Sequence, residues 1–541
     1  MSEMVLLADE AVALAAVHAG LTAAYGYPGT PSTEILEYLI RHARTHGGPR
    51  AEWCANEKTA YEAALGVSFA GRRTMVTMKH VGLNVAADPF MNSALVTVNG
   101  GLVVAVADDP GMHSSQNEQD SRVFADFARV VCLEPASHQE AYEMTREAFD
   151  ISERFHIPVM IRLVTRLAHS RGIVEIGEAR GENPPHKNLQ SSAWVLLPGN
   201  ARRQWRALLD RFDDIRAYVS ASRFNSVDSG SGDGFGVITT GLARNYFLEN
   251  LDDLAARPAH LHVGAYPYPV EAIRAFVAPL QRVLLLEEGY SYVERALRGI
   301  VPPAHLEIQG RESGAVPPDG ELNPDIVRAA LGLPARAGVS IPGLSLPGRP
   351  PQLCAGCPHG DSFHSITSVL AAFPDAIVTA DIGCSTLGAL PPYNAIETCV
   401  CMGASIGMAK GAADAGYHPV VAVIGDSTFL HSGVTALMDA VAADTPMTLV
   451  ILDNKTVAMT GGQPTIRTSS ELEAVVRGLG VPPGHLHVLE AHPKRMAENT
   501  EILRREVNHR GLSVVIGVRE CIETAKRSKQ EKAVIAAAAQ E

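Results

Sequence analysis

Two short polar endings follow apolar segments in the last third of the chain. The segment VVAVIGD ends in Asp426, and MTLVILDN ends in Asn454. Between them, SGVTALMDAVAAD has helical spacing of its apolar residues and an N-terminal Ser-Gly, so the pattern predicts a β-α-β unit. Parallel strands end at the same edge of a sheet, which would place Asp426 beside Asn454. One carboxylate and one amide oxygen suit a Mg²⁺ ion that also binds a phosphate.

A Gly-Asp pair at a strand end also occurs in ordinary turns, where the Asp side chain caps backbone amides. The second strand, which ends in Asn454, favours a bound ion over a turn alone. No Lys follows the glycine of this pair, so the segment is not a phosphate-binding P-loop.

Length and composition predict a globular protein of three or four domains, with 541 residues, 46% apolar and 19% charged. The net charge of −13 and the lack of a basic run argue against nucleic-acid binding. The N-terminal MSEMVLLADEAVALAAVHAG has no basic segment, so we predict an amphipathic helix and not a signal peptide. The longest uncharged stretch, 89–107, contains Asn and Gly and predicts two elements around a turn. We therefore expect no membrane segment, a cytoplasmic location and reduced cysteines.

Apolar strand-length runs alternate with helical patterns along most of the chain, which predicts an α/β fold of several doubly wound parallel-sheet domains. Polar or Pro/Gly-rich stretches at 179–190 and 334–352 resemble linkers. The predicted boundaries divide the chain into domains at 1–180, 190–335 and 350–525, followed by a tail at 526–541.

Six motifs occur in a fixed order along the chain: GYPGTPSTEI (26–35), WCANEKTAYEAALG (53–66), MKHVGLNVAADP (78–89), ADDPGMHSSQNEQD (107–120), DIGCSTLGALPP (381–392) and CMGASIGMAKGAA (401–413), before the GD and DN endings. Together they closely resemble the large (alpha) subunit of indolepyruvate ferredoxin oxidoreductase. That family belongs to the thiamine-diphosphate-dependent 2-oxoacid:ferredoxin oxidoreductases, and the resemblance covers roughly residues 8–525. It implies a thiamine-diphosphate-binding fold with a pyrimidine-binding domain, a transketolase C-terminal-like domain and a diphosphate/Mg-binding domain, in that order.

The resemblance assigns the ion and its diphosphate. Asp426, the Asn454 side chain and the Thr456 carbonyl would bind Mg²⁺. The loops that contact the cofactor diphosphate would include Gly383, Ser385, Gly403, Gly425 and Ser427. Close helix–sheet packing is the alternative explanation for each glycine.

The resemblance also assigns residues of the first domain. Glu57 would be the catalytic carboxylate that hydrogen-bonds the thiamine pyrimidine and activates the cofactor. Its alternative role is to stabilise the dipole of the helix that it begins. Thr30, His80 and His113 would contact the substrate, although a loop histidine is often merely solvated.

The cysteines depart from the family pattern. The family usually ends in a ferredoxin-like domain with repeated C-x-x-C-x-x-C-x-x-x-C-P runs, and this sequence lacks those runs. Related oxidoreductases hold one [4Fe-4S] cluster through a C-x-x-C pair and two later cysteines, which here would be Cys354, Cys357, Cys384 and Cys521. The alternative is that CAGCPH forms a tight turn with buried free thiols. The other four, Cys54, Cys132, Cys399 and Cys401, are interpreted as core or loop residues.

The expected activity is the oxidative decarboxylation of an aryl 2-oxoacid, indolepyruvate or phenylpyruvate, to the arylacetyl-CoA. It would require thiamine diphosphate, Mg²⁺ and coenzyme A, with one iron–sulfur cluster. The expected partners are a smaller gamma-type (beta) subunit, ferredoxin or another external electron acceptor, and a second large chain. The sequence also leaves two alternatives open: a non-oxidative thiamine-dependent decarboxylase or carboligase, and a non-catalytic scaffold subunit.

Overall fold

The computed structural model describes residues 2–186, 191–231, 234–299, 305–338, 348 and 351–538. The chain forms two compact units, residues 1–340 and 341–541. Among the described residues, no helix combines the length and the apolar character that crossing a bilayer requires.

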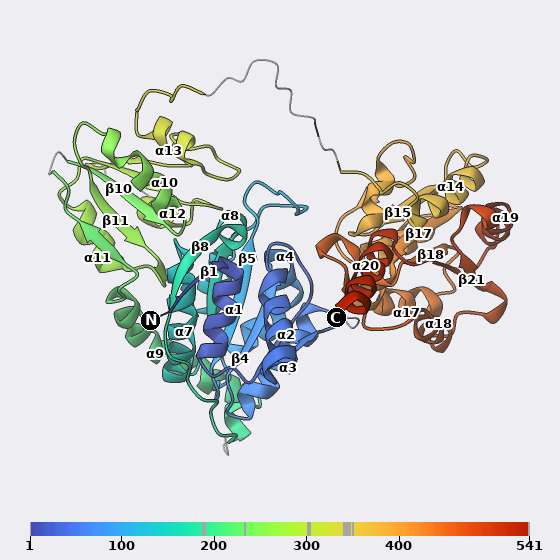
Figure 1. Ribbon diagram of the computed structural model, residues 1–541, viewed down its shortest axis with the longest axis horizontal. Helices are drawn as coiled ribbons and strands as arrows, with labels where there is room; N and C mark the ends of the chain where they lie inside the picture. The colour runs from blue at the N-terminus through green and yellow to red at the C-terminus, as the bar shows by residue number, and fades with distance from the viewer. Residues whose placement is uncertain are drawn as a thin grey trace. The chain divides into compact units, whose positions relative to one another are not determined.

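The first unit contains a seven-stranded sheet that is parallel except for its β12 edge (Figure 1). In spatial order its strands are β12 (Ala265–Tyr266), β6 (Val131–Leu133), β7 (Val159–Val164), β5 (Leu102–Asp108), β4 (Thr74–Lys79), β2 (Ala23–Gly26) and β3 (Arg50–Trp53). Its helices are α1 (Ala8–His18), α2 (Thr33–His46), α3 (Glu57–Phe69), α4 (His80–Val85), α5 (Ala87–Ser93), α6 (Arg122–Ala128), α7 (His138–Phe155) and α8 (Thr165–His169). Every residue of β4, β5 and β7 is buried, as expected for parallel strands covered on both faces.

The N-terminal segment differs from the prediction of a single amphipathic helix. Residues Ser2–Leu7 form strand β1, which pairs in antiparallel fashion with β8 (Arg171–Ile176), and α1 begins only at Ala8. The helix is then buried along most of its length, because its small alanine side chains allow α2 and α7 to pack closely against it. The Ala-rich run therefore predicted the helix but not its burial. Strand β1 was not predicted, because its partner strand β8 is distant in sequence.

A second sheet completes the first unit. Its strands in spatial order are β14 (Glu307–Gln309), β13 (Arg282–Leu286), β10 (Phe235–Thr240), β11 (Ala259–Val263) and β9 (Ser226–Asp228). Its helices are α10 (Ala243–Asn250), α11 (Val270–Val277), α12 (Tyr292–Arg298) and α13 (Pro324–Ala330). Helix α9 (Pro198–Ser220) contacts both β12 of the first sheet and α11. One continuous hydrophobic core contains residues of both sheets.

Two fully buried arginines tie the two sheets of the first unit together. Arg122 forms ion pairs with Asp120 and Glu287, and Arg162 pairs with Asp108 at 2.7 Å. Both guanidinium groups also donate to the carbonyl oxygen of Glu288, which follows strand β13. These charges hold the segment that follows β5 in a fixed position, because a buried ion is stable only with its partners in place.

The second unit contains a six-stranded parallel sheet (Figure 1). Its strands in spatial order are β16 (Thr398–Cys399), β15 (Ile377–Ala380), β17 (Val420–Gly425), β18 (Thr448–Asp453), β22 (Ser513–Val518) and β21 (Leu486–Glu490). Its longer helices are α14 (Pro358–Leu370), α15 (Ala404–Asp414), α17 (Val434–Ala442), α18 (Ser469–Gly478), α19 (Met496–Val507) and α20 (Ile522–Ala538). A short hairpin of β19 (Thr456–Val457) and β20 (Gln463–Pro464) follows β18.

The predicted β-α-β unit is present in this sheet. Strands β17 and β18 are parallel neighbours in which Gly425 is level with Leu452, so their polar endings emerge side by side. The helix between them begins earlier than the Ser-Gly pair suggested. A short helical turn starts at Asp426 and continues through a π-helical turn, Phe429–Gly433, into α17. Asp426 therefore lies at the start of a helix as well as at the end of a strand.

Candidate functional site

The carboxyl ends of four neighbouring strands carry the predicted residues of the first unit. The spatial order β5-β4-β2-β3 brings together the loops after each of these strands. Glu57 follows β3, Thr30 follows β2, His80 follows β4 and His113 follows β5. The topology thus places residues that are up to 83 positions apart at one sheet edge, where ligands bind in open α/β sheets.

Glu57 is the first residue of α3 and is almost completely buried, with 4% exposure. Asn56 caps this helix by accepting the Thr59 N–H at 2.9 Å, which fixes the helix start. The Glu57 carboxylate packs against Gly82 of α4, where an added Cβ would lie 2.5 Å from Oε1. A helix-dipole role does not require burial, so the enclosure of this carboxylate favours a chemical role.

Lys79 is a functional candidate that the sequence analysis missed. It ends β4, is 9% exposed, and lies along Gly29, where an added Cβ would be 3.2 Å from its Cδ. Burial lowers the pKa of Lys79, and the nearby carboxylates of Asp109 and Glu57 oppose that shift. Glu57 therefore shares its sheet edge with a buried ammonium group.

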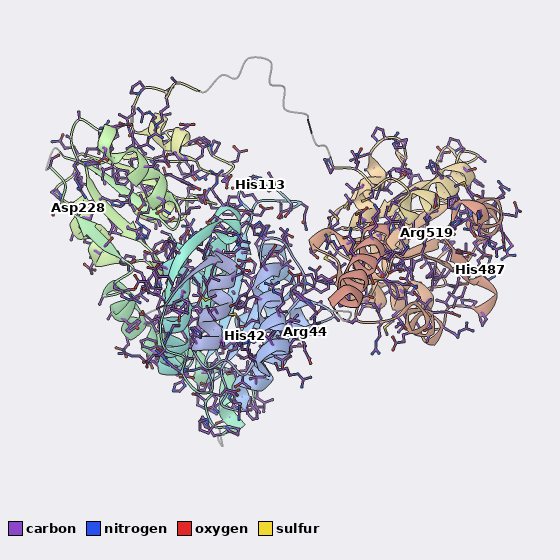
Figure 2. The ribbon with its side chains drawn as sticks, in the orientation of Figure 1. His42, Arg44, His113, Asp228, His487 and Arg519 are labelled. Carbon is purple, nitrogen blue, oxygen red and sulfur yellow. The ribbon has the colours of Figure 1, made fainter. Side chains whose placement is uncertain are left out.

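The three predicted substrate residues have different surroundings. Thr30 is half-buried, and its carbonyl accepts the Ser114 hydroxyl at 3.4 Å. His80 is 1% exposed; its Nε2 contacts the Asn117 carbonyl at 3.2 Å, and its Nδ1 lacks a partner among the described residues. His113, labelled in Figure 2, is exposed, and its Nε2 lies 3.3 Å from a carboxylate oxygen of Glu321.

Asp109, also missed from the sequence, organises the loop that joins these residues. Its Oδ2 accepts the Ser114 N–H at 2.8 Å and the Ser115 hydroxyl at 2.6 Å, and its Oδ1 accepts the Thr165 hydroxyl at 2.7 Å. The carboxylate thereby fixes the segment that contacts Thr30.

In the second unit, two buried carboxylates meet where β17 and β18 end. Asp426 is 5% exposed and Asp453 is 3% exposed, and both accept the Lys455 N–H, at 3.0 and 3.1 Å respectively. Burial raises the pKa of Asp426 well above its usual value, and the neighbouring Asp453 carboxylate raises it further. Within the described part of the chain, neither carboxylate has an ion pair with a basic side chain, and Asp453 Oδ2 has no hydrogen-bond partner. A divalent cation would offset this concentrated negative charge.

The turn after β18 presents the other predicted ion ligands. Asn454 and Thr456 are both buried, and Asn454 Oδ1 accepts the Thr456 N–H at 3.1 Å. Lys455 between them has a φ of +64°, which a residue with a side chain rarely adopts. This sharp turn places the three residues beside Asp426. The Asp426 carboxylate, the Asn454 amide oxygen and the Thr456 carbonyl form a donor set that fits Mg²⁺.

The predicted diphosphate segments lie around the helical turns that begin at Asp426. Gly383 has a φ of +146°, and an added Cβ there would lie 3.8 Å from the Thr428 hydroxyl. The Ser385 hydroxyl donates to the Asp381 carbonyl at 3.0 Å. Gly403 has a φ of +91° and no room for a Cβ, which would lie 2.4 Å from Ser432 Cβ. Gly425 and Ser427 flank Asp426 and are half-buried.

Asp381 has a structural role that the sequence analysis did not assign. Its carboxylate accepts the Gly403 N–H at 2.6 Å and the Ser405 N–H at 3.2 Å, and so caps the start of α15. Burial raises the pKa of Asp381 to about 6, against the effect of these hydrogen bonds. The Gly403 amide is therefore already bonded within the protein.

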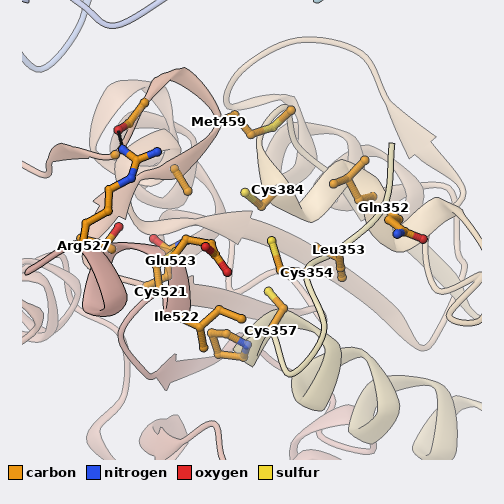
Figure 3. A pocket seen from close by; sticks show the side chains of 17 residues that line it. Gln352, Leu353, Cys354, Cys357, Cys384, Met459, Cys521, Ile522, Glu523 and Arg527 are labelled. Atoms are coloured by element: carbon orange, nitrogen blue, oxygen red, sulfur yellow. Dashed lines mark hydrogen bonds between the residues drawn. The ribbon is translucent and has the colours of Figure 1, made fainter. Parts of the chain in front are cut away.

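The four predicted cluster cysteines line one cavity of about 230 Å³ (Figure 3). They come from three separate segments, and each begins or precedes a helical element: Cys354, Cys357, Cys384 and Cys521. All four are free thiols. Burial raises the pKa of Cys384 to about 12, and the three other thiols contribute to that shift.

Backbone and side-chain contacts join two of the three cysteine segments to each other and to the predicted ion site. Cys357 N–H donates to the Cys354 carbonyl at 3.0 Å, and Arg519 pairs with Asp361 at 2.7 Å beside that turn. The Cys521 N–H donates to the carbonyl of Asn454 at 3.0 Å, and Asn454 itself lines the cavity. Asn454 therefore belongs both to the predicted ion site and to the lining of the cysteine cavity.

The shape and chemistry of this cavity fit an iron–sulfur cluster. Four thiols converge on one space without disulfides, and a positively charged metal centre would favour their thiolate form. The other cysteines, Cys54, Cys132, Cys399 and Cys401, do not line the cavity. A tight turn at CAGC is also present, but it accounts for only two of the four thiols.

Two segments of the chain, one in each unit, match known protein families. Residues 381–517 match the family described as thiamine pyrophosphate enzyme, C-terminal TPP binding domain. Residues 14–193 match the thiamine-diphosphate-binding domain of pyruvate flavodoxin/ferredoxin oxidoreductases. The two matches cover the two sheet edges at which Glu57 and Asp426 lie.

Full-length relatives specify the family. An indolepyruvate oxidoreductase subunit IorA of Archaeoglobus fulgidus is 38% identical over 98% of this chain and 88% of its own length. The subunits of the same name from Methanothermobacter thermautotrophicus and Thermococcus kodakarensis are 37% and 35% identical, each over 96% of this chain, and over 87% and 86% of their own lengths. The chain belongs to the IorA family. It is thus a subunit of a thiamine-diphosphate-dependent 2-oxoacid oxidoreductase, and the α/β fold expected from the sequence is confirmed.

Proposed function

We propose that this IorA-family chain catalyses the oxidative decarboxylation of an aryl 2-oxoacid, such as indolepyruvate or phenylpyruvate, to the arylacetyl-CoA. The 2-oxoacid loses CO₂, its acyl group forms a thioester with coenzyme A, and two electrons pass to an external acceptor such as ferredoxin. The aryl substrate is supported by the names of the relatives, which are indolepyruvate oxidoreductase subunits. A smaller gamma-type subunit and a second copy of this chain would complete the enzyme.

The four-cysteine cavity is the observation that carries the oxidative part of this proposal. A decarboxylase that releases an aldehyde has no need of an electron carrier, whereas the oxidative reaction must remove two electrons. Cys354, Cys357, Cys384 and Cys521 would hold one [4Fe-4S] cluster, which accepts electrons one at a time. Because Asn454 lines the same cavity, the electrons would leave beside the Mg²⁺ site.

The remaining residues have proposed roles that follow from their positions. When bound, thiamine diphosphate would supply the nucleophilic carbon that attacks the 2-oxoacid. The buried Glu57 carboxylate would hold a proton shared with the pyrimidine ring nitrogen. Thr30, His80 and His113 would orient the substrate, with Lys79 as a further candidate for its carboxylate. Asp426, Asn454 and Thr456 would hold Mg²⁺, next to Gly383, Ser385, Gly403, Gly425 and Ser427 around the diphosphate.

A product analysis tests this proposal. Purified protein with its partner subunit would be incubated anaerobically with indolepyruvate, thiamine diphosphate, Mg²⁺, coenzyme A and a one-electron dye. We expect dye reduction and indoleacetyl-CoA, both dependent on coenzyme A. We further expect Cys384→Ser to lose dye reduction and Cys401→Ser, a cysteine outside the cavity, to keep it.

Two other products would contradict the proposal. Indoleacetaldehyde formed without coenzyme A or dye would instead establish a non-oxidative decarboxylase. Failure to bind thiamine diphosphate at all would identify a scaffold subunit.

A further inference from the structure

A second cluster of potential metal ligands lies in the first unit, outside the site described above. It consists of Asp9, Glu34 and His169, whose ligand atoms all lie within 4.8 Å of one another. Asp9 is the second residue of α1, Glu34 is the second residue of α2, and His169 is the last residue of α8. Two successive helices, α1 and α2, and the distant α8 thus direct one ligand each to the same point.

Asp9 is the unusual member of this cluster. Its side chain is 0% exposed, and neither carboxylate oxygen has a hydrogen-bond partner within the described part of the chain. Burial raises the pKa of Asp9 well above its usual value, and the carboxylates of Glu34 and Glu10 raise it further. A buried carboxylate with no donor is strongly unfavourable, so the site requires either a proton or a cation.

Stabilisation of a helix dipole does not account for this arrangement. An acidic residue in a first turn provides that stabilisation without full burial, as the partly exposed Glu10 does beside Asp9. Glu10 has its own partners, since it accepts the Leu7 N–H at 3.0 Å and lies 3.4 Å from Arg41. The Asp9 carboxylate instead points at Glu34 and His169, which form an ion pair at 3.4 Å.

We propose that Asp9, Glu34 and His169 bind a divalent transition-metal ion, with Zn²⁺ as the best match to the ligands. Two carboxylates and one imidazole suit Zn²⁺, whereas Mg²⁺ and Ca²⁺ prefer oxygen ligands alone. Zinc–ligand distances of about 2.0–2.2 Å in a tetrahedron place the ligand atoms about 3.4 Å apart. Ligand atoms that now lie up to 4.8 Å apart would therefore have to move closer when the ion binds. The side chains of Glu34 and His169 are 33% and 35% exposed, so the ion can enter from solvent, and water would complete its coordination.

The bound ion would join α1 and α8 to the start of α2. The GYPGTP loop leads directly into α2, and the Gly29 N–H donates to the Thr33 hydroxyl at 3.0 Å within that loop. The ion would therefore stabilise the helix start that positions Thr30. It would be a structural ion and not a participant in the reaction, because Glu57 lies on a different helix and is not among its ligands.

Zinc retention by the full-length protein tests this site. Wild-type protein, Asp9→Asn, His169→Gln and the control Glu10→Gln would be equilibrated with Zn²⁺ in excess Mg²⁺, passed through a desalting column and analysed for zinc. We expect Asp9→Asn and His169→Gln to retain one zinc per chain fewer than wild type, and Glu10→Gln to retain the wild-type amount. The difference between variants excludes zinc bound at the cysteines, which all four proteins contain.

Thermal unfolding supplies a second readout. We expect added Zn²⁺ to raise the melting temperature of wild type but not of His169→Gln, which changes a partly exposed side chain and should fold normally. Equal zinc contents and equal shifts in melting temperature in wild type and His169→Gln would overturn the proposal. Asp9 would then be neutralised by a proton instead of an ion.

Discussion

Replacing Glu57 with glutamine is expected to lower turnover by about two to four orders of magnitude, the usual contribution of a side chain that transfers a proton. The substitution keeps the size of the side chain and its packing against Gly82, where space is too tight for any larger change. A glutamine amide cannot share a proton with a ring nitrogen as a carboxyl group does. The affinity for thiamine diphosphate should therefore stay close to that of wild type.

Two measurements check this prediction: the rate of dye reduction with a 2-oxoacid, and a calorimetric titration with thiamine diphosphate. Glu62→Gln is the matched control, because Glu62 lies on the exposed face of the same helix, where it pairs with Lys58. Unchanged turnover in Glu57→Gln would remove Glu57 from the mechanism. A loss of cofactor binding with a normal rate at saturation would assign it to binding alone.

Replacing Asp426 with alanine should weaken Mg²⁺-dependent binding of thiamine diphosphate by about 100-fold or more, because even residues that only support metal ligands contribute about 10–100-fold. Asp426 is buried at the start of a helix and at the end of β17, and it lies next to Asp453. Its removal takes away one predicted ligand and the negative charge that attracts the ion.

A titration of thiamine diphosphate with and without Mg²⁺ measures this effect. The exposed Asp439→Ala on α17 is the control, since it removes the same group from the surface of the same β-α-β unit. Wild type and Asp426→Ala should bind the cofactor equally weakly once EDTA has removed the metal. Normal Mg²⁺-dependent affinity in Asp426→Ala would show that another group holds the ion.

The positions of the predicted residues followed from sequence because they depend on strand ends. Parallel strands can be recognised from apolar runs, and their carboxyl ends must share an edge, so Asp426 and Asn454 could be placed together before any contact was known. The cysteines could be grouped only through the family resemblance, since their three segments are far apart. The cavity that they line appears only in the folded unit.

The residues that sequence analysis missed act through contacts between distant segments. Asp381 was part of a recognised motif, but its capping of α15 depends on how two strands and a helix pack. Asp453 precedes Asn454, and its closeness to Asp426 depends on the register of β17 and β18. Lys79 stands in no spacing pattern with other polar residues that would have indicated a functional role. Strand β1 was missed because its partner, β8, lies more than 160 residues away along the chain.

Iron and acid-labile sulfide in anaerobically purified protein test the central claim most directly. We expect about four of each per chain in wild type and in Cys401→Ser, as for one [4Fe-4S] cluster. We also expect a loss of both in Cys384→Ser, whose thiol faces the cavity. Essentially no iron in wild type, with thiamine diphosphate still bound, would contradict the proposed cluster. Either another chain would then carry the electrons, or the reaction would be non-oxidative.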